Sequence, residues 1–164
     1  MEILTTENQE VKYAGFWLRF VAYLIDDIVL SFAGFIVALP FIGGIIFSAI
    51  GMSDSHEFDE KTVLGIAGIL GSVLGMVLII IILGWLYFAL MESSKNQATL
   101  GKLALGLKVT DMEGNRISFA RATGRYFGKI ISGMILYVGY FMAGFTEKKQ
   151  ALHDMLAGCL VVRK

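Results

Sequence analysis

Two long apolar runs dominate this chain and restrict how it can fold. They cover residues 20–51 and 62–91, and each exceeds the roughly 20 residues with which an α-helix crosses a bilayer. A helix suits such a run because it satisfies all of its backbone N–H and C=O groups within the segment. With 56% of its 164 residues hydrophobic, the chain is too apolar for an ordinary soluble domain.

The first run carries charges that a membrane-spanning helix tolerates only when they have partners. Arg19 and Asp26 stand seven residues apart, so a helix places them about two turns apart on nearly the same face. The long side chain of Arg19 can extend back to the lipid headgroups, whereas that of Asp26 is short. Asp26 therefore needs a countercharge from elsewhere in the chain.

Polar segments set the domain boundaries. We predict a flexible cytoplasmic N-terminus over residues 1–12, followed by a single membrane domain over residues 13–164. Aromatic side chains at the start of the first span, such as that of Trp17, suit a membrane interface. The expected spans lie at about 18–50, 62–91 and 127–145.

Two features of the long spans predict their geometry. Pro40, the only proline, is expected to kink or end the first helix near Leu39. Glycines recur along the second span, where they let a neighbouring helix approach closely. They are Gly65, Gly68, Gly71 and Gly75. We expect this track to pack against the first span.

The third apolar segment is barely long enough to cross a bilayer. Residues 130–145 are interrupted by Gly133, Gly139 and Gly144. A full crossing would also place the basic residues of the tail outside the cell, against the positive-inside rule. We therefore predict a re-entrant hairpin that turns between Gly133 and Gly139, with its turn buried in protein or facing water.

The positions of lysine and arginine orient the chain. Thirteen of the fourteen lie before residue 20 or after residue 92, and Lys61 is the one in the loop between the first two spans. Cytoplasmic loops of membrane proteins carry an excess of these residues. We therefore predict that both termini and residues 93–129 are cytoplasmic.

A small β ribbon is expected beside the helices. Residues 107–111 alternate like a strand, residues 112–115 form a turn signal, and Ser118 offers an N-cap for the next helix. Residues 160–164 follow a short helix that ends near Gly158 and can pair with the first strand. The predicted fold class is an all-α polytopic membrane protein with two long transmembrane helices, a third short or re-entrant apolar segment and a small cytoplasmic β ribbon.

Further charged residues are candidates for the same set. Arg125 and Lys129 stand one turn apart on the helix that leads into the third segment, so they either pair with Asp26 or bind anionic lipid headgroups. Asp154 lies in the tail, on the same predicted side of the membrane as Arg19. His153 is expected to make a local polar contact rather than to act as a general base.

Three stretches of the chain resemble the RDD family of bacterial membrane proteins, whose name denotes one arginine and two aspartates. The matching positions are Arg19, Asp26 and Asp154, while Asp27 is extra beside the pattern. The stretches are residues 14–26, then Thr99-Leu100-Gly101-Lys102 with Gly106-Leu107-Lys108-Val109, and finally residues 152–158. The resemblance implies a bacterial inner-membrane location and a role in transport, with cation/proton exchange proposed for some members.

Two functions of different classes are compatible with these residues, and we expect the first, with the second as the alternative. In the first, the protein moves cations, protons or small solutes, with Asp26 and Asp154 as titrating groups and Arg19 setting the pKa of both. In the second, the three charges form a structural salt bridge in a non-transporting scaffold or accessory subunit. The expected partners are the lipid bilayer, anionic headgroups, and a second copy or another membrane protein. No sequence motif indicates an enzyme, a cofactor, a metal or a nucleic-acid partner.

Overall fold

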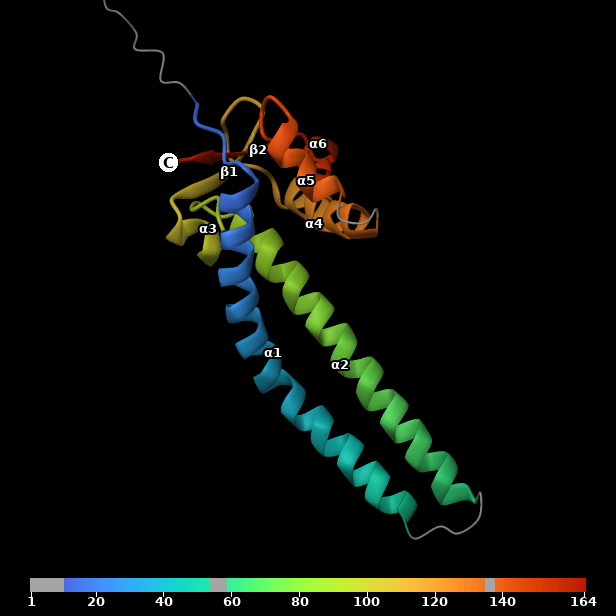
Figure 1. Ribbon diagram of the computed structural model, residues 1–164. Coiled ribbons are helices and arrows are strands. Elements are labelled where there is room, and N and C mark those ends of the chain that lie inside the picture. Colours follow the sequence, from blue (N-terminus) through green and yellow to red (C-terminus); the bar gives the residue numbers. More distant parts are fainter. Residues whose placement is uncertain (1–10, 54–58, 135–137) are drawn as a thin grey trace, which may run out of the picture. The chain divides into compact units, whose positions relative to one another are not determined.

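The computed structural model describes residues 11–53, 59–134 and 138–164 (Figure 1). It is mostly helical, with one small antiparallel sheet in the described residues. In chain order the elements are α1 (Phe16–Ser53), α2 (Glu60–Glu92), α3 (Leu100–Ala104), β1 (Leu107–Asp111), α4 (Phe119–Met134), α5 (Val138–Phe145), α6 (Leu152–Leu156) and β2 (Cys159–Arg163).

The chain divides into two compact units. The hairpin unit is Asp26–Tyr87, and the terminal unit combines the chain up to Ile25 with Phe88–Lys164. Helix α1 begins in the terminal unit and helix α2 ends there, but most of both helices belongs to the hairpin unit.

Helices α1 and α2 are both long and apolar enough to cross a membrane. Large apolar side chains along both of them are exposed, among them those of Phe32, Phe47, Leu64 and Leu74. Exposing so large an apolar surface to water is unfavourable, whereas contact with the acyl chains of a bilayer is not. The prediction of a polytopic membrane protein with two long transmembrane helices is confirmed.

Pro40 lies inside α1, which continues to Ser53. Of the two effects expected at Pro40, a kink or an end of the helix, the end is therefore wrong. A proline removes one backbone hydrogen bond from a helix, but a helix that stopped within the membrane would leave many more backbone groups without partners. The apolar setting thus favours continuing the helix through the proline.

Within the hairpin unit, the glycines of α2 lie against side chains of α1. A Cβ atom added at Gly68 would meet the hydroxyl oxygen of Ser48, and one at Gly75 would lie 3.0 Å from Cε1 of Phe41. Gly71 differs, because nothing lies within 4 Å of a Cβ atom built there. Close packing of the second span on the first is thus observed, with Gly71 outside the contact.

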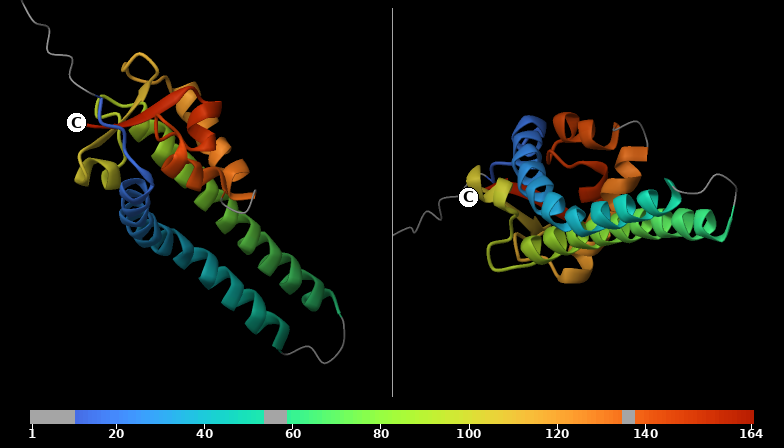
Figure 2. Two further views of the ribbon diagram at one scale, coloured as in Figure 1. Left: turned by 45° about the horizontal axis from the view of Figure 1, so that its top comes forward. Right: turned by 90° about the horizontal axis from the view of Figure 1, so that it is seen from below.

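The terminal unit contains the predicted ribbon. Strands β1 and β2 pair antiparallel, with Val109 opposite Val161 at the centre of the register, and both of these side chains are fully buried. The segment before α1 joins the outer edge of β2, since the Ala14 N–H donates to the carbonyl of Val161 (2.8 Å) and Tyr13 forms a bridge with Val162. Figure 2 shows this segment beside the ribbon.

Local signals build the connection from β1 to α4. The carboxylate of Asp111 accepts hydrogen bonds from the N–H groups of Glu113 (3.0 Å) and Asn115 (2.7 Å), and Gly114 adopts the positive φ of 88° that the turn requires. The hydroxyl of Ser118 then accepts a hydrogen bond from the N–H of Arg121 (3.2 Å), as predicted for an N-cap.

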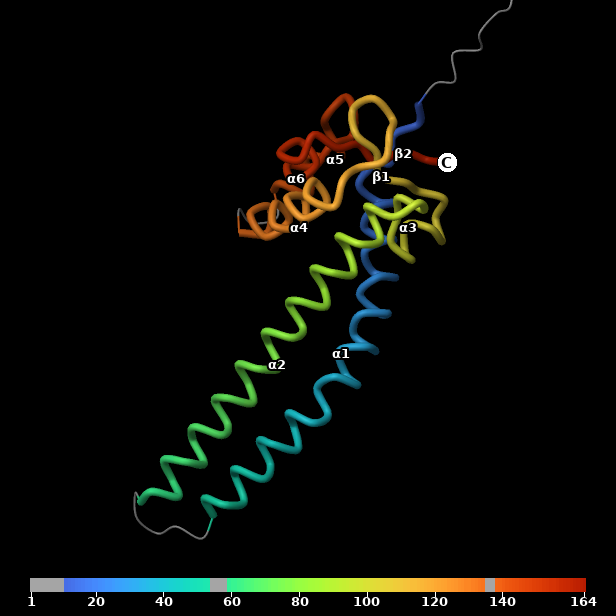
Figure 3. Tube along the Cα trace, turned by 180° about the vertical axis from the view of Figure 1, so that it is seen from behind, coloured from blue at the N-terminus to red at the C-terminus, as the bar shows by residue number. Residues whose placement is uncertain are grey.

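The third apolar segment is bent. Helices α4 and α5 meet at 104°, and residues 135–137, on which part of the predicted turn falls, lie outside the described residues. Strand β1 precedes α4, β2 follows α5, and the two strands are hydrogen-bonded to each other. Figure 3 traces this path from β1 through α4, α5 and α6 back to β2. The two ends of the bent segment therefore lead into the same two-stranded ribbon.

The glycine contacts give a first prediction. Gly68→Leu should lower the stability of the purified protein by about 1–3 kcal/mol, because the larger side chain forces α1 and α2 apart. Gly71→Leu is the matched control three residues further along the same helix. It should leave the thermal unfolding temperature in detergent unchanged or raise it, since leucine is a better helix former than glycine. Equal losses in the two variants would contradict this helix contact.

Candidate functional site

A buried arginine joins two carboxylates in the terminal unit. Arg125 of α4 is 2% exposed. Its Nη1 lies 2.6 Å from Oε2 of Glu92, at the end of α2, and its Nη2 lies 2.7 Å from Oδ1 of Asp154, in α6. The Nε group donates a further hydrogen bond of 2.8 Å to the same oxygen of Asp154. One planar guanidinium thus holds helices α2, α4 and α6 together.

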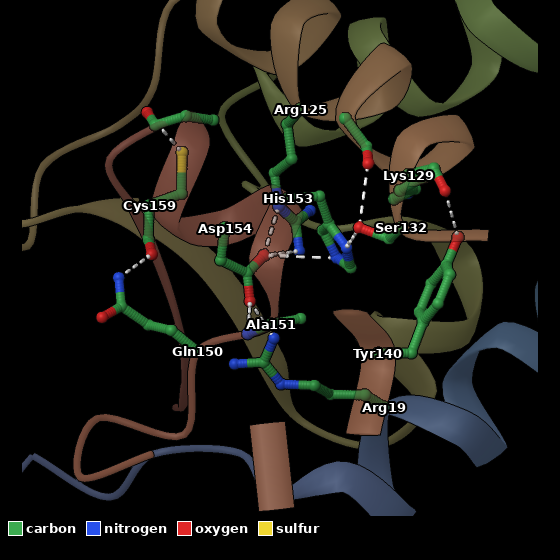
Figure 4. A network of polar contacts seen from close by, with 12 residues as sticks. Arg19, Arg125, Lys129, Ser132, Tyr140, Gln150, Ala151, His153, Asp154 and Cys159 are labelled. Atoms are coloured by element: carbon green, nitrogen blue, oxygen red, sulfur yellow. Dashed lines mark hydrogen bonds and ion pairs between the residues drawn. The ribbon is translucent and has the colours of Figure 1, made fainter. Parts of the chain in front are cut away.

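Asp154 is fully buried and receives hydrogen bonds at both carboxylate oxygens. Arg125 donates twice to Oδ1, while Arg19 and the N–H of Ala151 (3.1 Å) donate to Oδ2. Figure 4 shows the two guanidinium groups reaching this carboxylate from different sides. A carboxylate offers about four lone-pair positions, so these donors leave none for a proton or a cation.

Arg19 uses its whole guanidinium inside the protein. Besides the ion pair with Asp154, its Nε donates to the carbonyl of Ala14 (2.8 Å) and its Nη2 to the carbonyl of Lys149 (2.6 Å). These contacts tie the first turns of α1 to α6 and to the loop before it. Arg19 therefore does not extend to the headgroups, which was one of the two roles considered for it.

Glu92 collects three cations. Arg125 contacts one of its oxygens, and Lys102 of α3 together with Lys129 of α4 (3.7 Å) contacts the other. The ammonium group of Lys129 also lies 3.8 Å from the centroid of the Phe88 ring, a cation–π contact. These residues, with Arg19 and Asp154, form what we call the ion network: Arg19, Glu92, Lys102, Arg125, Lys129 and Asp154.

The electrostatics of the network keep Asp154 ionised. Burial by itself raises the pKa of its carboxyl, but the guanidinium of Arg125 and then that of Arg19 outweigh burial and hold the pKa well below its usual range. A carboxylate that stays ionised in this way does not exchange a proton near neutral pH. This property limits what Asp154 can do in a transport cycle.

His153 lies beside the network as a neutral ring. Its Nε2 is 3.5 Å from Oδ1 of Asp154, its Nδ1 is 3.3 Å from the hydroxyl of Ser132, and its ring is 5.1 Å from that of Tyr140. Gly128 makes room for it, since a Cβ atom there would lie 3.1 Å from Cβ of His153. Burial lowers the pKa of His153 to about 3. The predicted local polar contact is thus present in the structure.

The order Ser132, His153, Asp154 invites comparison with a nucleophilic triad. Such a site needs a hydroxyl that a substrate can reach. Ser132 is fully buried, its hydroxyl lies 2.9 Å from the carbonyl of Gly128, and the carboxylate of Asp154 already serves two arginines. The arrangement therefore packs α4 against α6.

Asp26 and Asp27 belong to the hairpin unit. Asp26 is 1% exposed, and its Oδ1 accepts a hydrogen bond of 2.7 Å from the hydroxyl of Tyr87. Asp27, the neighbour that the family pattern does not require, is exposed. The pairing of Asp26 with Arg125 or Lys129 that the sequence offered would join the two units, and it stays a prediction.

Sequence reasoning named four members of the site and missed two. The structure brings Arg19, Arg125, Lys129 and Asp154 into one network, with His153 beside it. Arg125, considered as a partner of Asp26 or of lipid, pairs with Glu92 and Asp154. The missed residues are Glu92 and Lys102. A signal for Glu92 existed, because it is an acidic residue that ends a long apolar run and cations follow it.

Comparisons with known proteins found one matching family model and two relatives. A model of the RDD family matches residues 13–158. The chain is 41% identical to the "Uncharacterized protein YxaI" of Bacillus subtilis (strain 168) over 153 residues, which are 93% of this chain and 99% of that protein. It is 30% identical to the "Uncharacterized membrane protein YteJ" of the same organism over 158 residues, 93% of this chain and 82% of that protein. No solved structure matches.

The central arginine gives a second prediction. Arg125→Ala should lower stability by about 3–5 kcal/mol, because it leaves two buried carboxylates without their shared partner. Arg125→Lys should lie between this variant and the wild type, since an ammonium group cannot reach both carboxylates. Arg121→Ala is the matched control one turn earlier, where the side chain is 43% exposed and 3.9 Å from Asp111. Chemical unfolding in detergent measures all three. An Arg125→Ala loss no larger than that of Arg121→Ala would contradict the central role.

His153 gives a third prediction, for the pH dependence of stability. The pKa of His153 lies near 3 in the folded protein and near 6.5 in the unfolded chain. Its contribution to stability is therefore complete above pH 6.5 and is lost as the pH falls from 6.5 towards 3, by about 1.4 kcal/mol per pH unit. His153→Gln should flatten the unfolding free energy between pH 6.5 and 4.5. His56→Gln, at the only other histidine of the sequence, is the control. A slope that persists in His153→Gln would contradict the assignment.

Proposed function

We propose that this chain, which belongs to the RDD family of membrane proteins, is a non-transporting scaffold or accessory subunit. In this proposal the arginine and aspartate residues of the terminal unit are structural. They keep that unit rigid at the membrane surface, where it binds and positions another membrane protein or a second copy of the chain.

The observation that carries this proposal is the state of Asp154. Its carboxylate is buried, receives donors at both oxygens and has a pKa far below neutral. A transport residue must release one partner and accept another during each cycle. Asp154 could do this only if Arg19 and Arg125 both left it, and that step would leave buried charges unpaired.

The same proposal includes a location and an orientation. The membrane is the bacterial cell membrane, and the ribbon with both termini faces the cytoplasm. Support comes from the charge distribution, since thirteen of the fourteen lysines and arginines lie before residue 20 or after residue 92. The ribbon also joins residues near both ends of the chain on one side, through Tyr13 and β2.

Cation/proton exchange is the second candidate, and one observation favours it. Asp26 is a buried carboxylate in a helix that can span the membrane, and it accepts a hydrogen bond from Tyr87. An ionisable residue at such a position is by default a candidate for ion movement. In this alternative Asp26 titrates, while Asp154 remains fixed in the network.

Ion flux gives the fourth prediction and separates the two candidates. The purified wild type in proteoliposomes should show no H⁺, Na⁺ or K⁺ flux above that of protein-free liposomes. Flux that Asp26→Asn abolishes and Arg121→Ala retains would instead establish transport and overturn the scaffold. Tyr87→Phe should then reduce the flux, because it removes the hydroxyl that donates to Asp26.

Partner binding is measured separately on membranes extracted with polymer, without detergent. The wild type and Asp26→Asn should both carry the same second protein, or a second copy of the chain, at a fixed ratio. Arg125→Lys, which loosens the ion network, should lose that companion, whereas Arg121→Ala should keep it. A chain that is monomeric and alone in every such preparation would contradict the scaffold.

A further inference from the structure

Helix α4 has its polar face inside the protein and its apolar face outside. The residues of α4 that are buried are small or charged: Ala122, Arg125, Gly128 and Ser132. Its exposed side chains over the second half of the helix are large and apolar: Phe127, Ile130, Ile131 and Met134. This polarity is the reverse of that expected for a helix on a protein surface in water.

Helix α5 shows the same pattern. Gly139 and Ala143 are buried, whereas Val138, Phe141 and Phe145 are exposed, the last at 89%. The two helices touch at their small residues, since a Cβ atom at Gly139 would lie 2.8 Å from Cβ of Ser132. Together α4 and α5 thus present one kind of surface, large apolar side chains, to their surroundings.

Contacts with the ends of the long helices indicate the depth of this surface. The Phe141 ring of α5 stacks on that of Phe16 (4.9 Å between centroids), in the first turn of α1 and next to the exposed Trp17. On the other helix, the Tyr126 ring lies 6.1 Å from that of Phe88, near the end of α2. Aromatic side chains at the ends of spanning helices mark the membrane interface.

We propose that α4 and α5 form an interfacial hairpin that is embedded in the leaflet on the side of the β ribbon and does not cross the bilayer. The apolar face of the hairpin contacts acyl chains, and its polar face carries Arg125 and Lys129 into the ion network. Lipid is the occupant because this face is continuous, through Phe141 and Phe16, with the helix that spans the membrane.

The hairpin does not cross the bilayer because the segments before and after it pair with each other. Residues on both sides of α4 and α5 meet in the β1–β2 ribbon, and Arg125 within α4 pairs with Asp154 beyond α5. A hairpin whose two ends stay on one side can enter a leaflet with its apolar face while its backbone polar groups remain in helices. The leaflet then also shields the network from water.

Fluorescent labels at single cysteines test the depth. An environment-sensitive dye is attached to one hairpin position at a time, in the variants Ile131→Cys, Met134→Cys and Phe145→Cys. Each labelled protein is placed in vesicles of phosphatidylethanolamine and phosphatidylglycerol at a low protein-to-lipid ratio. Val77→Cys in the middle of α2 is the deep reference, and Arg116→Cys in the exposed turn is the aqueous one. Wild type is the unlabelled control, because Cys159 is buried and burial raises its thiol pKa to about 11.

Nitroxides at acyl-chain carbons near the headgroup should quench the fluorescence of the hairpin labels. Nitroxides near the terminal methyl group should quench the label at Val77→Cys. Neither nitroxide should quench the label at Arg116→Cys. Hairpin labels as insensitive as Arg116→Cys would overturn the proposal. An impermeant maleimide gives the second measurement. Arg116→Cys and Lys148→Cys should react from the same side and Lys61→Cys from the other. Reaction of Lys148→Cys from the side opposite to Arg116→Cys would mean a full crossing and would equally overturn it.

Discussion

The terminal unit depends on the forked guanidinium of Arg125. It links a carboxylate at the end of a spanning helix, Glu92, to a carboxylate in the tail, Asp154, and both are almost completely buried. Each ion would be costly alone in such a place, and each is tolerated because the others are present. Lys102 and Arg19 extend the same pairing to α3 and α1. Cooperative burial of charge, in addition to apolar packing, therefore sets how these helices lie together.

The two family aspartates differ in their surroundings. Asp154 is paired with two arginines, which hold the pKa of its carboxyl well below its usual range. Asp26 lies in the hairpin unit, where its carboxylate accepts a hydrogen bond from the hydroxyl of Tyr87. The inverted polarity of α4 fits the same physics, because a helix with acyl chains on one side must turn its charges towards the protein. This explains why Arg125 is buried and Lys129 partly buried, whereas Ile130 and Ile131 are exposed.

Much of the fold could be predicted because it rests on local patterns. The long apolar runs, the alternation at residues 107–111 and the cap at Ser118 each act over a few neighbouring residues, and the structure shows all three. The sequence left two effects open at Pro40, a kink or an end of the helix, because the outcome depends on the surrounding medium. Glu92 was missed because it ends an apolar run. At such a position the sequence does not distinguish an acidic side chain that faces water from one that is buried in the protein.

Charges beside the apolar runs and the resemblance to the RDD family pointed to Arg19, Asp26 and Asp154. By itself, the sequence further determined the class of the protein, its two spans and the ribbon strands. Hydrophobic periodicity and composition are sufficient for such conclusions, because bilayer thickness and backbone hydrogen bonding leave few options. Only the tertiary structure decided which charges pair. Coulomb attraction acts between any opposite charges that come within a few ångströms, and the folded arrangement of α2, α4 and α6 selects Arg125 as the shared partner of Glu92 and Asp154.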